Sequence, residues 1–291
     1  MVLGKRMRVA IIGVNGQLGS DLAKEFARTH DVIGITHDQL DITDFQRAKE
    51  VLLSAQPSVV LNTAAFHVVP ACETEPQKAF DINALGAKHL AQLSQEIGYT
   101  LVQYSTNYVF DGNKKTPYHE GDAPNPLNVY GVTKLAGESF VRNYSEKHYV
   151  LRISGIYGST PCRAKGENFI TKIIKMSKER PQLKIVDDEV LTPTPTHEIA
   201  RQTIELIKSN AYGLYHMTCE GECSWFEFAA HIFKTLQIST PLVSCKSHEF
   251  PSSVKRPLYS ALENFNMKSQ GINSMPHWTL ALDQFLREHH Q

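Results

Sequence analysis

The sequence Arg8-Val-Ala-Ile-Ile-Gly13-Val-Asn-Gly16-Gln-Leu-Gly19 joins a short apolar run to the start of a helical pattern. Glycine allows a tight turn, a close approach of the backbone to a pyrophosphate, and close packing of a helix on a strand. The N–H groups at the start of the helix then attract phosphate. The spacing Gly-x-x-Gly-x-x-Gly therefore predicts a dinucleotide-binding turn. Its expected cofactor contacts are Gly13, Asn15, Gly16, Gln17, Leu18 and Gly19.

Short apolar runs alternate with helical patterns through the N-terminal half of the chain. We expect buried strands at 8–13, 32–36, 59–63 and 101–105, and helices at 17–29, 44–54 and 76–97. Strands separated by helices indicate βαβ units and a parallel sheet, whose carboxyl ends meet at one ligand-binding edge. The predicted fold is α/β, with a Rossmann-type doubly wound parallel sheet and a smaller C-terminal substrate-binding lobe.

The second half follows a looser pattern. Helices are expected at 130–145, 168–178, 225–236 and 280–289, and strands at 149–154 and 183–186. The prolines of Thr192-Pro-Thr-Pro-Thr196 exclude a central strand, because proline cannot donate to the ladder. We predict an NAD(P)-binding domain at 5–155 and a mainly substrate-binding lobe at 156–291, with segments around 190–220 returning to the Rossmann core.

The composition argues against several classes of partner. The 291 residues carry 30 Lys and Arg against 30 Asp and Glu, and nucleic acid or membrane surfaces usually require a basic excess, so we expect neither. No apolar run reaches the roughly 20 residues of a spanning helix, and no secretory signal is apparent. The five cysteines lack metal-ligand spacing, so we expect a reduced, cytoplasmic protein without a metal site.

The end of the second strand normally selects the cofactor, because an acid there binds the ribose 2′-OH and repels a 2′-phosphate. Thr36 and His37 occupy this place and tolerate a phosphate, so NADPH is favoured and NADH is left open. Asp41 and Ile42 follow, and an acid beside an aliphatic side chain suits the adenine amino group and ring. A helix cap before Phe45 is the alternative role for Asp41.

A phenol and an ammonium lie one helical turn apart in Tyr130-Gly-Val-Thr-Lys134. A nearby ammonium favours the phenolate, so we expect a lowered pKa for Tyr130 and proton exchange with a carbonyl or alcohol oxygen. Lys134 is also suited to hold the nicotinamide ribose. Thr106 ends the fourth expected strand and is placed to bind the reacting oxygen. The predicted catalytic residues are Tyr130, Lys134 and Thr106.

These ordered motifs resemble the extended short-chain dehydrogenases and, within them, the dTDP-4-dehydrorhamnose reductase family. The resemblance covers the segments 13–19, 61–65, 104–112, 126–138, 151–158, 193–194, 213–216, 224–225 and 256–257. It implies reduction of the C4 ketone of a nucleotide-activated 4-keto-6-deoxyhexose with NAD(P)H, in nucleotide-sugar and polysaccharide biosynthesis. It also implies that Tyr130 protonates the forming alkoxide while Lys134 and Thr106 assist. Family members include dimers, so a homodimer is left open.

The resemblance also implies further contacts. Ala64, Ala65, Phe66 and Tyr104 are expected at the cofactor, together with Tyr130 and Lys134. The implied substrate-binding residues are Thr106, Asn107, Gly155, Asn168, Phe169 and Arg256. Asn168, Phe169 and Arg256 are expected near the nucleotide diphosphate, since arginine suits phosphate geometry.

The sequence departs from the family pattern at three places. Asn107 replaces the acid of the common Ser-Thr-Asp-Tyr, and Gly155 replaces an aromatic residue that packs against the sugar. Pro70 and Ala71 replace polar residues after the third strand. We expect all three departures around the substrate, so the sequence supports the reaction type better than the particular sugar.

Two alternatives remain. The first is a sugar-nucleotide epimerase or dehydratase of the same superfamily. Dehydratases need an acid and a base beside the hydroxyl residue, whereas Asn107 and Tyr108 follow Thr106. The second is a non-catalytic NADP-binding regulatory subunit resembling methionine adenosyltransferase β, because a shared fold does not fix function. The intact set of Thr106, Tyr130 and Lys134 favours the enzyme.

Overall fold

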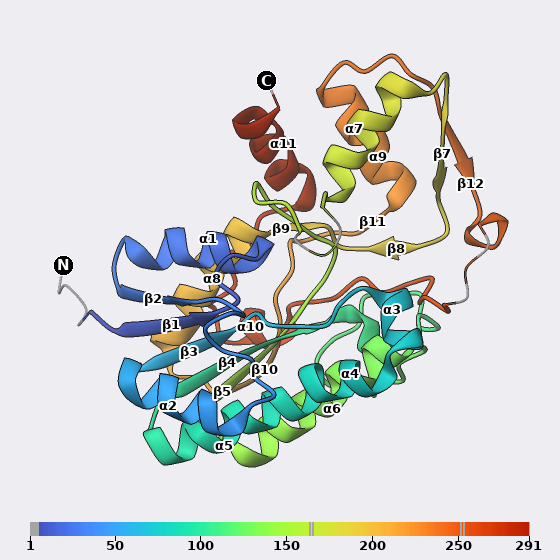
Figure 1. Cartoon of the computed structure of the whole chain (residues 1–291). Coiled ribbons are helices and arrows are strands. Elements are labelled where there is room, and N and C mark those ends of the chain that lie inside the picture. Colours follow the sequence, from blue (N-terminus) through green and yellow to red (C-terminus); the bar gives the residue numbers. More distant parts are fainter. Residues whose placement is uncertain (1–5, 163, 165, 251, 253, 291) are drawn as a thin grey trace.

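One parallel sheet forms the centre of the molecule (Figure 1). The computed structural model describes residues 6–162, 164, 166–250, 252 and 254–290. Within them the six-stranded sheet has the order β10-β5-β4-β3-β1-β2, and every pair of neighbours is parallel. The strands are β1 (Arg8–Ile12), β2 (Asp31–Ile35), β3 (Val59–Asn62), β4 (Thr100–Thr106), β5 (His148–Ile153) and β10 (Gly213–His216). The predicted Rossmann-type α/β fold is confirmed.

The side chains of β1 alternate between two hydrophobic cores. Val9 and Ile11 enter the core that α1 (Gln17–Ala27) and α8 (Thr196–Ser209) cover. Ala10 and Ile12 enter the opposite core, beneath α2 (Phe45–Ala55), α5 (Gly86–Ile97) and α6 (Val129–Tyr144) (Figure 1). Because helices cover both faces, the strands read as continuous apolar runs rather than as alternating ones.

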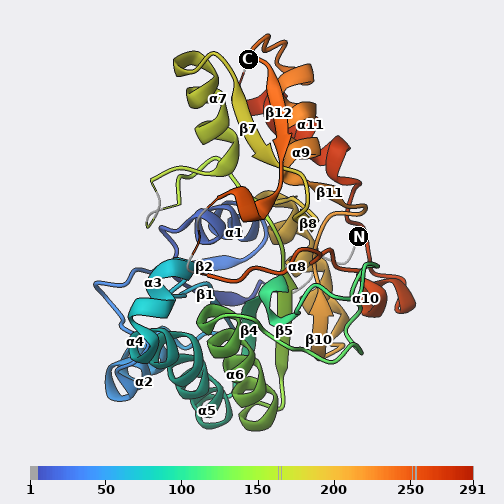
Figure 2. The same cartoon turned by 90° about the vertical axis from the view of Figure 1, so that its right-hand side faces the viewer.

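The C-terminal lobe lies to one side of the central sheet, at the upper right of Figure 1 and the top of Figure 2. Its main elements are α7 (Phe169–Glu179), β7 (Leu183–Val186), α9 (Trp225–Thr235), β12 (Leu242–Cys245) and α11 (Trp278–His289). The ring of Tyr157 lies 5.6 Å from that of Phe228 and 5.0 Å from that of Phe285. All three belong to the core that contains Val9 and Ile11, so the lobe and the sheet share one core.

Short elements connect these layers. They are α3 (Val69–Thr74), α4 (Pro76–Phe80), a π-helical turn (Asp81–Leu85), two 3₁₀ turns (Asn107–Val109 and Ser247–Glu249), β6 (Ile156–Tyr157), β8 (Val190–Leu191), β9 (Thr194–Pro195), β11 (Cys223–Ser224) and α10 (Phe265–Ser269). The helix expected at 76–97 is therefore three consecutive helical segments. β9 pairs only with β6, outside the central sheet, as the prolines there require.

Two elements of the second half of the chain belong to the central sheet and its covering helices rather than to the C-terminal lobe. α8 packs against α1, and β10 pairs with β5 at the edge of the sheet. α8 has no counterpart among the predicted elements, and the division into domains at residue 155 remains a prediction. Among the residues given above, no helix is both long and apolar enough to cross a membrane.

Candidate active site

The glycine turn brings the start of α1 to the carboxyl edge of the sheet. The backbone of Gly13 has φ +80°, and its N–H donates to the carbonyl of Ile35 over 2.8 Å. A Cβ at Gly13 would lie 2.6 Å from Thr63 Oγ1, and a Cβ at Gly19 would collide with the Gly13 carbonyl. Gly16 caps α1 without a side chain, so the first N–H groups of this helix keep no side-chain acceptor. The turn is a cradle for an anionic group that a larger residue would fill.

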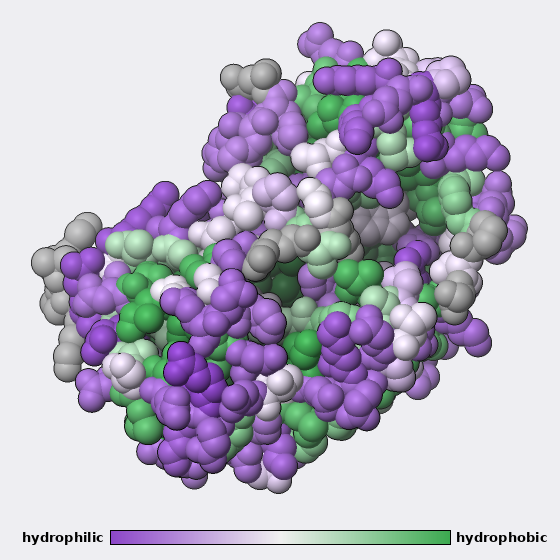
Figure 3. All heavy atoms as spheres, in the orientation of Figure 1, coloured by the Kyte–Doolittle hydropathy of each residue, from purple (hydrophilic) through white to green (hydrophobic). Residues whose placement is uncertain are grey.

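A cavity of about 580 Å³ opens at this edge, between the sheet and the C-terminal lobe. The surface is hollowed at this junction, with apolar side chains inside (Figure 3). The predicted site residues that line the cavity are Gly13, Asn15, Gly16, Gln17, Leu18, His37, Asp41, Ile42, Ala64, Ala65, Tyr104, Thr106, Asn107, Tyr130, Lys134, Gly155 and Asn168. The predicted residues absent from its lining are Gly19, Thr36, Phe66, Phe169 and Arg256.

Phe66 does not line the cavity, and its backbone is held by Asn83. Asn83 accepts from the Phe66 N–H and donates to the Phe66 carbonyl, both over 2.9 Å. The ammonium of Lys78 lies 5.0 Å from the centre of the Phe66 ring. His67 and Val69 line the wall instead, and the sequence pattern did not single them out.

Phe169 and Arg256 do not line the cavity themselves but lie close to residues that do. The ring of Phe169 lies 4.6 Å from that of Trp225, and Trp225 lines the cavity. Burial raises the pKa of the Glu189 carboxyl, and the charge of Arg256 opposes this shift. Burial also raises the pKa of Tyr108 to about 12, again against the charge of Arg256. Arg256 is therefore close enough to affect two residues of the lining.

The loop after β2 is fixed by its own side chains. Gln39 Oε1 accepts from the N–H of Thr36 over 2.8 Å and from its hydroxyl over 3.1 Å. Asp41 Oδ1 accepts from the N–H and the hydroxyl of Thr43 over 2.9 and 2.8 Å. The N-cap of α2 is Asp44, so the alternative role of Asp41 as that cap is wrong. Both His37 and Asp41 of this loop line the cavity.

Tyr130 and Lys134 lie on the first turns of α6, which Asn128 caps by accepting from the Gly131 N–H over 2.9 Å. Burial raises the pKa of Tyr130 well above its usual value, and a side-chain hydrogen bond with Thr106 opposes this. Burial lowers the pKa of Lys134 to about 8. Its ammonium donates to the Tyr104 carbonyl over 2.6 Å. The expected lowering of the Tyr130 pKa is wrong for this structure, because burial outweighs any effect of the ammonium.

Glu138 fastens the catalytic helix to β4. Its carboxylate accepts from the Ser105 hydroxyl over 2.5 Å and from Arg152 Nη2 over 2.7 Å, with both Glu138 and Arg152 fully buried. Ser105 lies between Tyr104, which binds the lysine, and Thr106. Glu138 thereby holds these two residues in register with α6. The sequence pattern missed this residue, although it follows Lys134 by one further helical turn.

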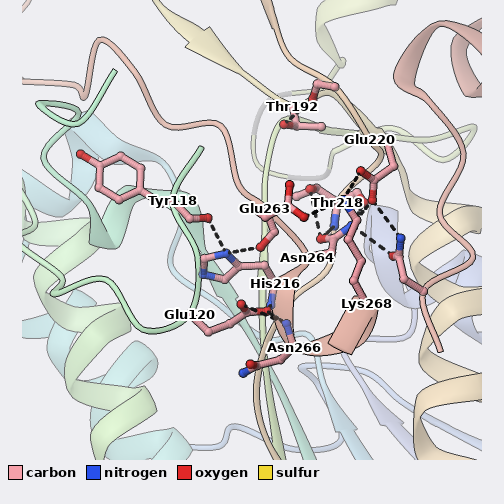
Figure 4. A network of polar contacts seen from close by, with 12 residues as sticks. Tyr118, Glu120, Thr192, His216, Thr218, Glu220, Glu263, Asn264, Asn266 and Lys268 are labelled. Atoms are coloured by element: carbon pink, nitrogen blue, oxygen red, sulfur yellow. Dashed lines mark hydrogen bonds and ion pairs between the residues drawn. The ribbon is translucent and has the colours of Figure 1, made fainter. Parts of the chain in front are cut away.

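A second polar network surrounds His216 (Figure 4). His216 Nδ1 is 3.0 Å from the Tyr118 carbonyl and 3.1 Å from the Glu263 carbonyl, so this nitrogen carries the hydrogen. Burial, with the charge of Arg152, lowers the pKa of His216 to about 3. Glu120 accepts from the His216 N–H over 2.8 Å. The network anchors residues 263–266 to β10 and the residues just after it. Pro257 and Ser260, earlier in the same segment, line the cavity.

Asn107, the first departure from the family pattern, joins the catalytic strand to the C-terminal segment. Its Nδ2 donates to Ser260 Oγ over 2.8 Å, and its Oδ1 accepts from the Thr106 hydroxyl over 3.3 Å. The Ser260 N–H donates to the Val190 carbonyl over 2.8 Å. An amide suits this position because it donates and accepts at once.

The other departures differ from the expectation. Gly155 lines the cavity with φ +53°, and a Cβ there would lie 2.7 Å from Leu191 Cδ1. An aromatic residue at this position would therefore be strained. Pro70 lies in the first turn of α3, and neither Pro70 nor Ala71 lines the cavity. The expectation that all three departures lie around the substrate cavity is wrong for this pair, which α3 carries outside the lining.

Asn168 also has a local task. Its side chain caps α7 by accepting from the Thr171 N–H over 3.0 Å, and it donates to the Gly158 carbonyl over 3.0 Å. Within the part of the chain that the structure describes, no group of three or more His, Cys, Asp or Glu side chains is arranged to hold a metal ion.

The glycine cradle, the carboxyl-edge cavity and the buried Tyr130–Lys134 pair together define an NAD(P)-dependent oxidoreductase of the extended short-chain dehydrogenase/reductase class.

Comparison with known proteins gives the family. The model of the family described as the RmlD substrate binding domain matches residues 7–291. Spore coat polysaccharide biosynthesis protein SpsK of Bacillus subtilis is 34% identical over 282 residues, covering 97% of each chain. The dTDP-4-dehydrorhamnose reductase of Escherichia coli is 32% identical over 297 residues, covering 97% of this chain and 98% of that one.

A solved structure agrees with these relatives. The dTDP-4-dehydrorhamnose reductase from Bacillus anthracis, in complex with NADP, superimposes with a TM-score of 0.93 at 35% identity. The match covers 98% of this chain and 100% of that chain. This chain belongs to the dTDP-4-dehydrorhamnose reductase family, which confirms the resemblance found in its sequence.

Proposed function

We propose that this protein uses NADPH to reduce the C4 ketone of a dTDP-linked 4-keto-6-deoxyhexose to an alcohol, in nucleotide-sugar biosynthesis. The observation that carries the proposal is the meeting of Thr106, Tyr130 and Lys134 in one cavity with the glycine turn. Relatives named dTDP-4-dehydrorhamnose reductase over nearly the whole chain support the same substrate class.

The residues present fit the cofactor. The Cβ-free cradle of Gly13, Gly16 and Gly19 suits a pyrophosphate at the start of α1. His37, Asp41 and Ile42 line the part of the cavity that suits the adenosine, and Thr36 and His37, rather than an acid, directly follow β2 where an acid would repel a 2′-phosphate. When bound, NADPH supplies the hydride for the reduction. A relative bound to NADP supports this choice over NADH.

Three side chains handle the proton. Because burial raises the pKa of Tyr130, its phenol stays protonated at neutral pH and is ready to donate to the alkoxide forming at C4. The Thr106 hydroxyl hydrogen-bonds Tyr130 and orients the same oxygen. Lys134, as an ammonium, holds the nicotinamide ribose and stabilises the phenolate that remains after proton transfer.

The far end of the cavity is assigned to the nucleotide sugar. Asn107, Gly155 and Trp225 line it, and Arg256 is close enough to influence Glu189 there. Arg256 is suited to attract the diphosphate. We assign the enzyme to the cytoplasm, and its assembly as a homodimer is to be checked by light scattering.

A substrate panel tests the proposal. NADPH and NADH oxidation is followed with dTDP-, UDP-, GDP- and CDP-linked 4-keto-6-deoxyhexoses. The expected result is fastest turnover with NADPH and the dTDP sugar. Fastest turnover with another base corrects the nucleotide and leaves the reaction type standing.

No turnover on any sugar, together with a stoichiometric synthetase partner recovered on the protein, would instead support the regulatory-subunit alternative. The Tyr130→Phe variant separates the two cases, because only a catalyst loses its function when this phenol is removed.

A further inference from the structure

A histidine and a cysteine from distant parts of the chain meet in the wall of the cavity. His67 follows β3, and Cys162 follows β6; both line the cavity. His67 Nε2 lies 3.2 Å from Cys162 Sγ. The proposed reduction uses neither side chain, and no motif of the sequence singled out either residue.

The backbone fixes the tautomer of His67. Its Nδ1 lies 3.3 Å from the Ala65 carbonyl, which can only accept a hydrogen bond. Nδ1 therefore carries the hydrogen of the neutral ring. The lone pair of Nε2 then faces the thiol of Cys162 and can take its proton. An imidazole in this position favours the thiolate, which is the reactive form of cysteine.

The other four cysteines are poor nucleophiles. Cys72, Cys219, Cys223 and Cys245 are buried, whereas Cys162 is partly exposed. Burial raises the pKa of Cys72 to about 11, and it also raises the pKa values of Cys219, Cys223 and Cys245. Cys162 is thus the thiol that a reagent in solution reaches first.

The segment that carries Cys162 crosses the start of α1. The Ser20 hydroxyl of α1 donates to Thr160 Oγ1 over 2.8 Å, and Lys24 lies 3.5 Å from Ser159 Oγ. The contact between His67 and Cys162 continues this crossing to the loop after β3. Because Cys162 lines the same cavity as the glycine turn, a group attached to its sulfur would occupy space in the cavity proposed for the dinucleotide.

We propose that Cys162 and His67 form a reactive thiol–imidazole pair, and that Cys162 is a site of reversible modification by small disulfides which closes the cavity to nucleotides. His67 Nε2 takes the thiol proton, and the Cys162 thiolate attacks one sulfur of the disulfide. A new bond forms at Sγ while the original S–S bond breaks. Cys162 is oxidised to a mixed disulfide, and the leaving thiolate receives a proton from His67.

Thiol labelling of the full chain tests the pair. The probe is 5,5′-dithiobis(2-nitrobenzoate), an aromatic disulfide, and peptide mapping locates the label. We expect one fast phase at Cys162, which Cys162→Ser removes. His67→Gln should slow this phase about tenfold at pH 7 and have less effect at high pH, where thiols ionise without help.

His231→Gln is the matched control, because His231 binds Asp283 on the surface over 2.7 Å, outside the cavity lining. It should leave the fast phase unchanged. A fast phase at another cysteine, or equal rates in wild type and His67→Gln, would overturn the pair. These readouts need no turnover, so they are independent of the proposed function.

Closure of the cavity has its own test. Oxidised glutathione is used to form the mixed disulfide, and NADP⁺ binding is measured by calorimetry before and after dithiothreitol. We expect at least a tenfold loss of affinity that dithiothreitol reverses, and slower labelling in the presence of NADP⁺. Unchanged affinity of the fully modified protein would overturn the closure.

Discussion

The two ends of the cavity are built differently. At the end that we propose for the cofactor, residues 13 and 15–18 come from a single turn. Close contacts with backbone atoms fix the shape of this turn. At the end that we propose for the substrate, Asn107, Gly155, Trp225 and Ser260 come from four separate segments. A continuous motif can be recognised in a sequence, whereas a cavity lining assembled from distant segments depends on the whole fold. The cofactor end is thus fixed by local chemistry, and the substrate end by tertiary structure.

Two of the three departures from the family pattern follow this difference, and the third, Pro70 with Ala71, lies outside the lining. Asn107 and Gly155 lie in the lining of the substrate end, while the glycine turn is intact. Each has a tertiary reason here: Asn107 binds Ser260, and Gly155 has φ +53° beside Leu191. α6 carries Tyr130 and Lys134, the residues that we propose for proton transfer, and both line the cavity. Mutations at these three places should therefore have separable effects.

The largest effect is expected at the junction, for Tyr130→Phe. Removing the phenol removes the proton donor but leaves the ring, so kcat should fall by about 10³-fold. The dissociation constant for NADP⁺ should stay within about twofold, since the glycine cradle is untouched. Steady-state kinetics and calorimetry measure the two quantities. Tyr144→Phe, on the exposed end of the same helix, is the control and should have no effect on either. Retained turnover would remove Tyr130 from the chemistry.

Gly19→Ala tests most directly whether the glycine turn holds the cofactor. The new Cβ collides with the Gly13 carbonyl, so the turn must shift. Such overpacking costs about 1–3 kcal/mol, and the NADP⁺ dissociation constant should rise by about 10- to 100-fold. Calorimetry measures this constant, and thermal unfolding checks that the fold survives.

Gly121→Ala is the matched control for this change, because its Cβ meets only the His119 ring, at 3.3 Å. The control should bind NADP⁺ like the wild type. Equal affinities for Gly19→Ala and Gly121→Ala would show that the cradle does not hold the cofactor.

The sequence predicted the cofactor end well for a physical reason. Residues 8–19 combine a strand, a turn and a helix start, and each part is determined by neighbours a few positions away. The central strands and the Tyr130–Lys134 spacing could be predicted from the sequence for the same reason. The direction of the Tyr130 pKa shift could not, because it is decided by burial under elements that are distant in the sequence.

The remaining misses depend on contacts between distant residues. Phe66 was expected at the cofactor, but Asn83 holds its backbone so that His67 faces the cavity instead. α8 was missed because both its start, after Pro195, and its packing on α1 depend on the assembled core. Glu138 was missed because its partners, Ser105 and Arg152, lie on two other strands.

A smaller effect on kcat/KM is expected for Glu138→Gln. Glu138 lies on α6, the helix that carries Tyr130 and Lys134. The ammonium of Lys134 is lost as the pH rises through its pKa of about 8, so kcat/KM for reduction should fall above that pH. The Glu138 carboxylate raises this pKa, against the lowering by burial. Its removal should therefore move the fall to lower pH and reduce kcat/KM about tenfold at pH 8. A pH profile of kcat/KM measures both.

Ser105→Ala separates charge from positioning. It removes the hydrogen bond to Glu138 and keeps the carboxylate, so kcat should fall without any movement of the alkaline limb. An alkaline limb that stays in place in Glu138→Gln would contradict the electrostatic role of Glu138 and leave only its contact with β4.

The smallest effect, and the sharpest test of the substrate end, is expected for Asn107→Asp. The change restores the acid common in the family but replaces the donor that binds Ser260 Oγ with a second acceptor. The serine hydroxyl can turn to donate, so the fold should survive and KM for the sugar should change by a few fold. The NADP⁺ dissociation constant should not change. Ser260→Ala loses the same hydrogen bond without adding charge, so it should reproduce the part of the effect that comes from the broken link. If Asn107→Asp instead weakened NADP⁺ binding, the two ends of the cavity would not be independent.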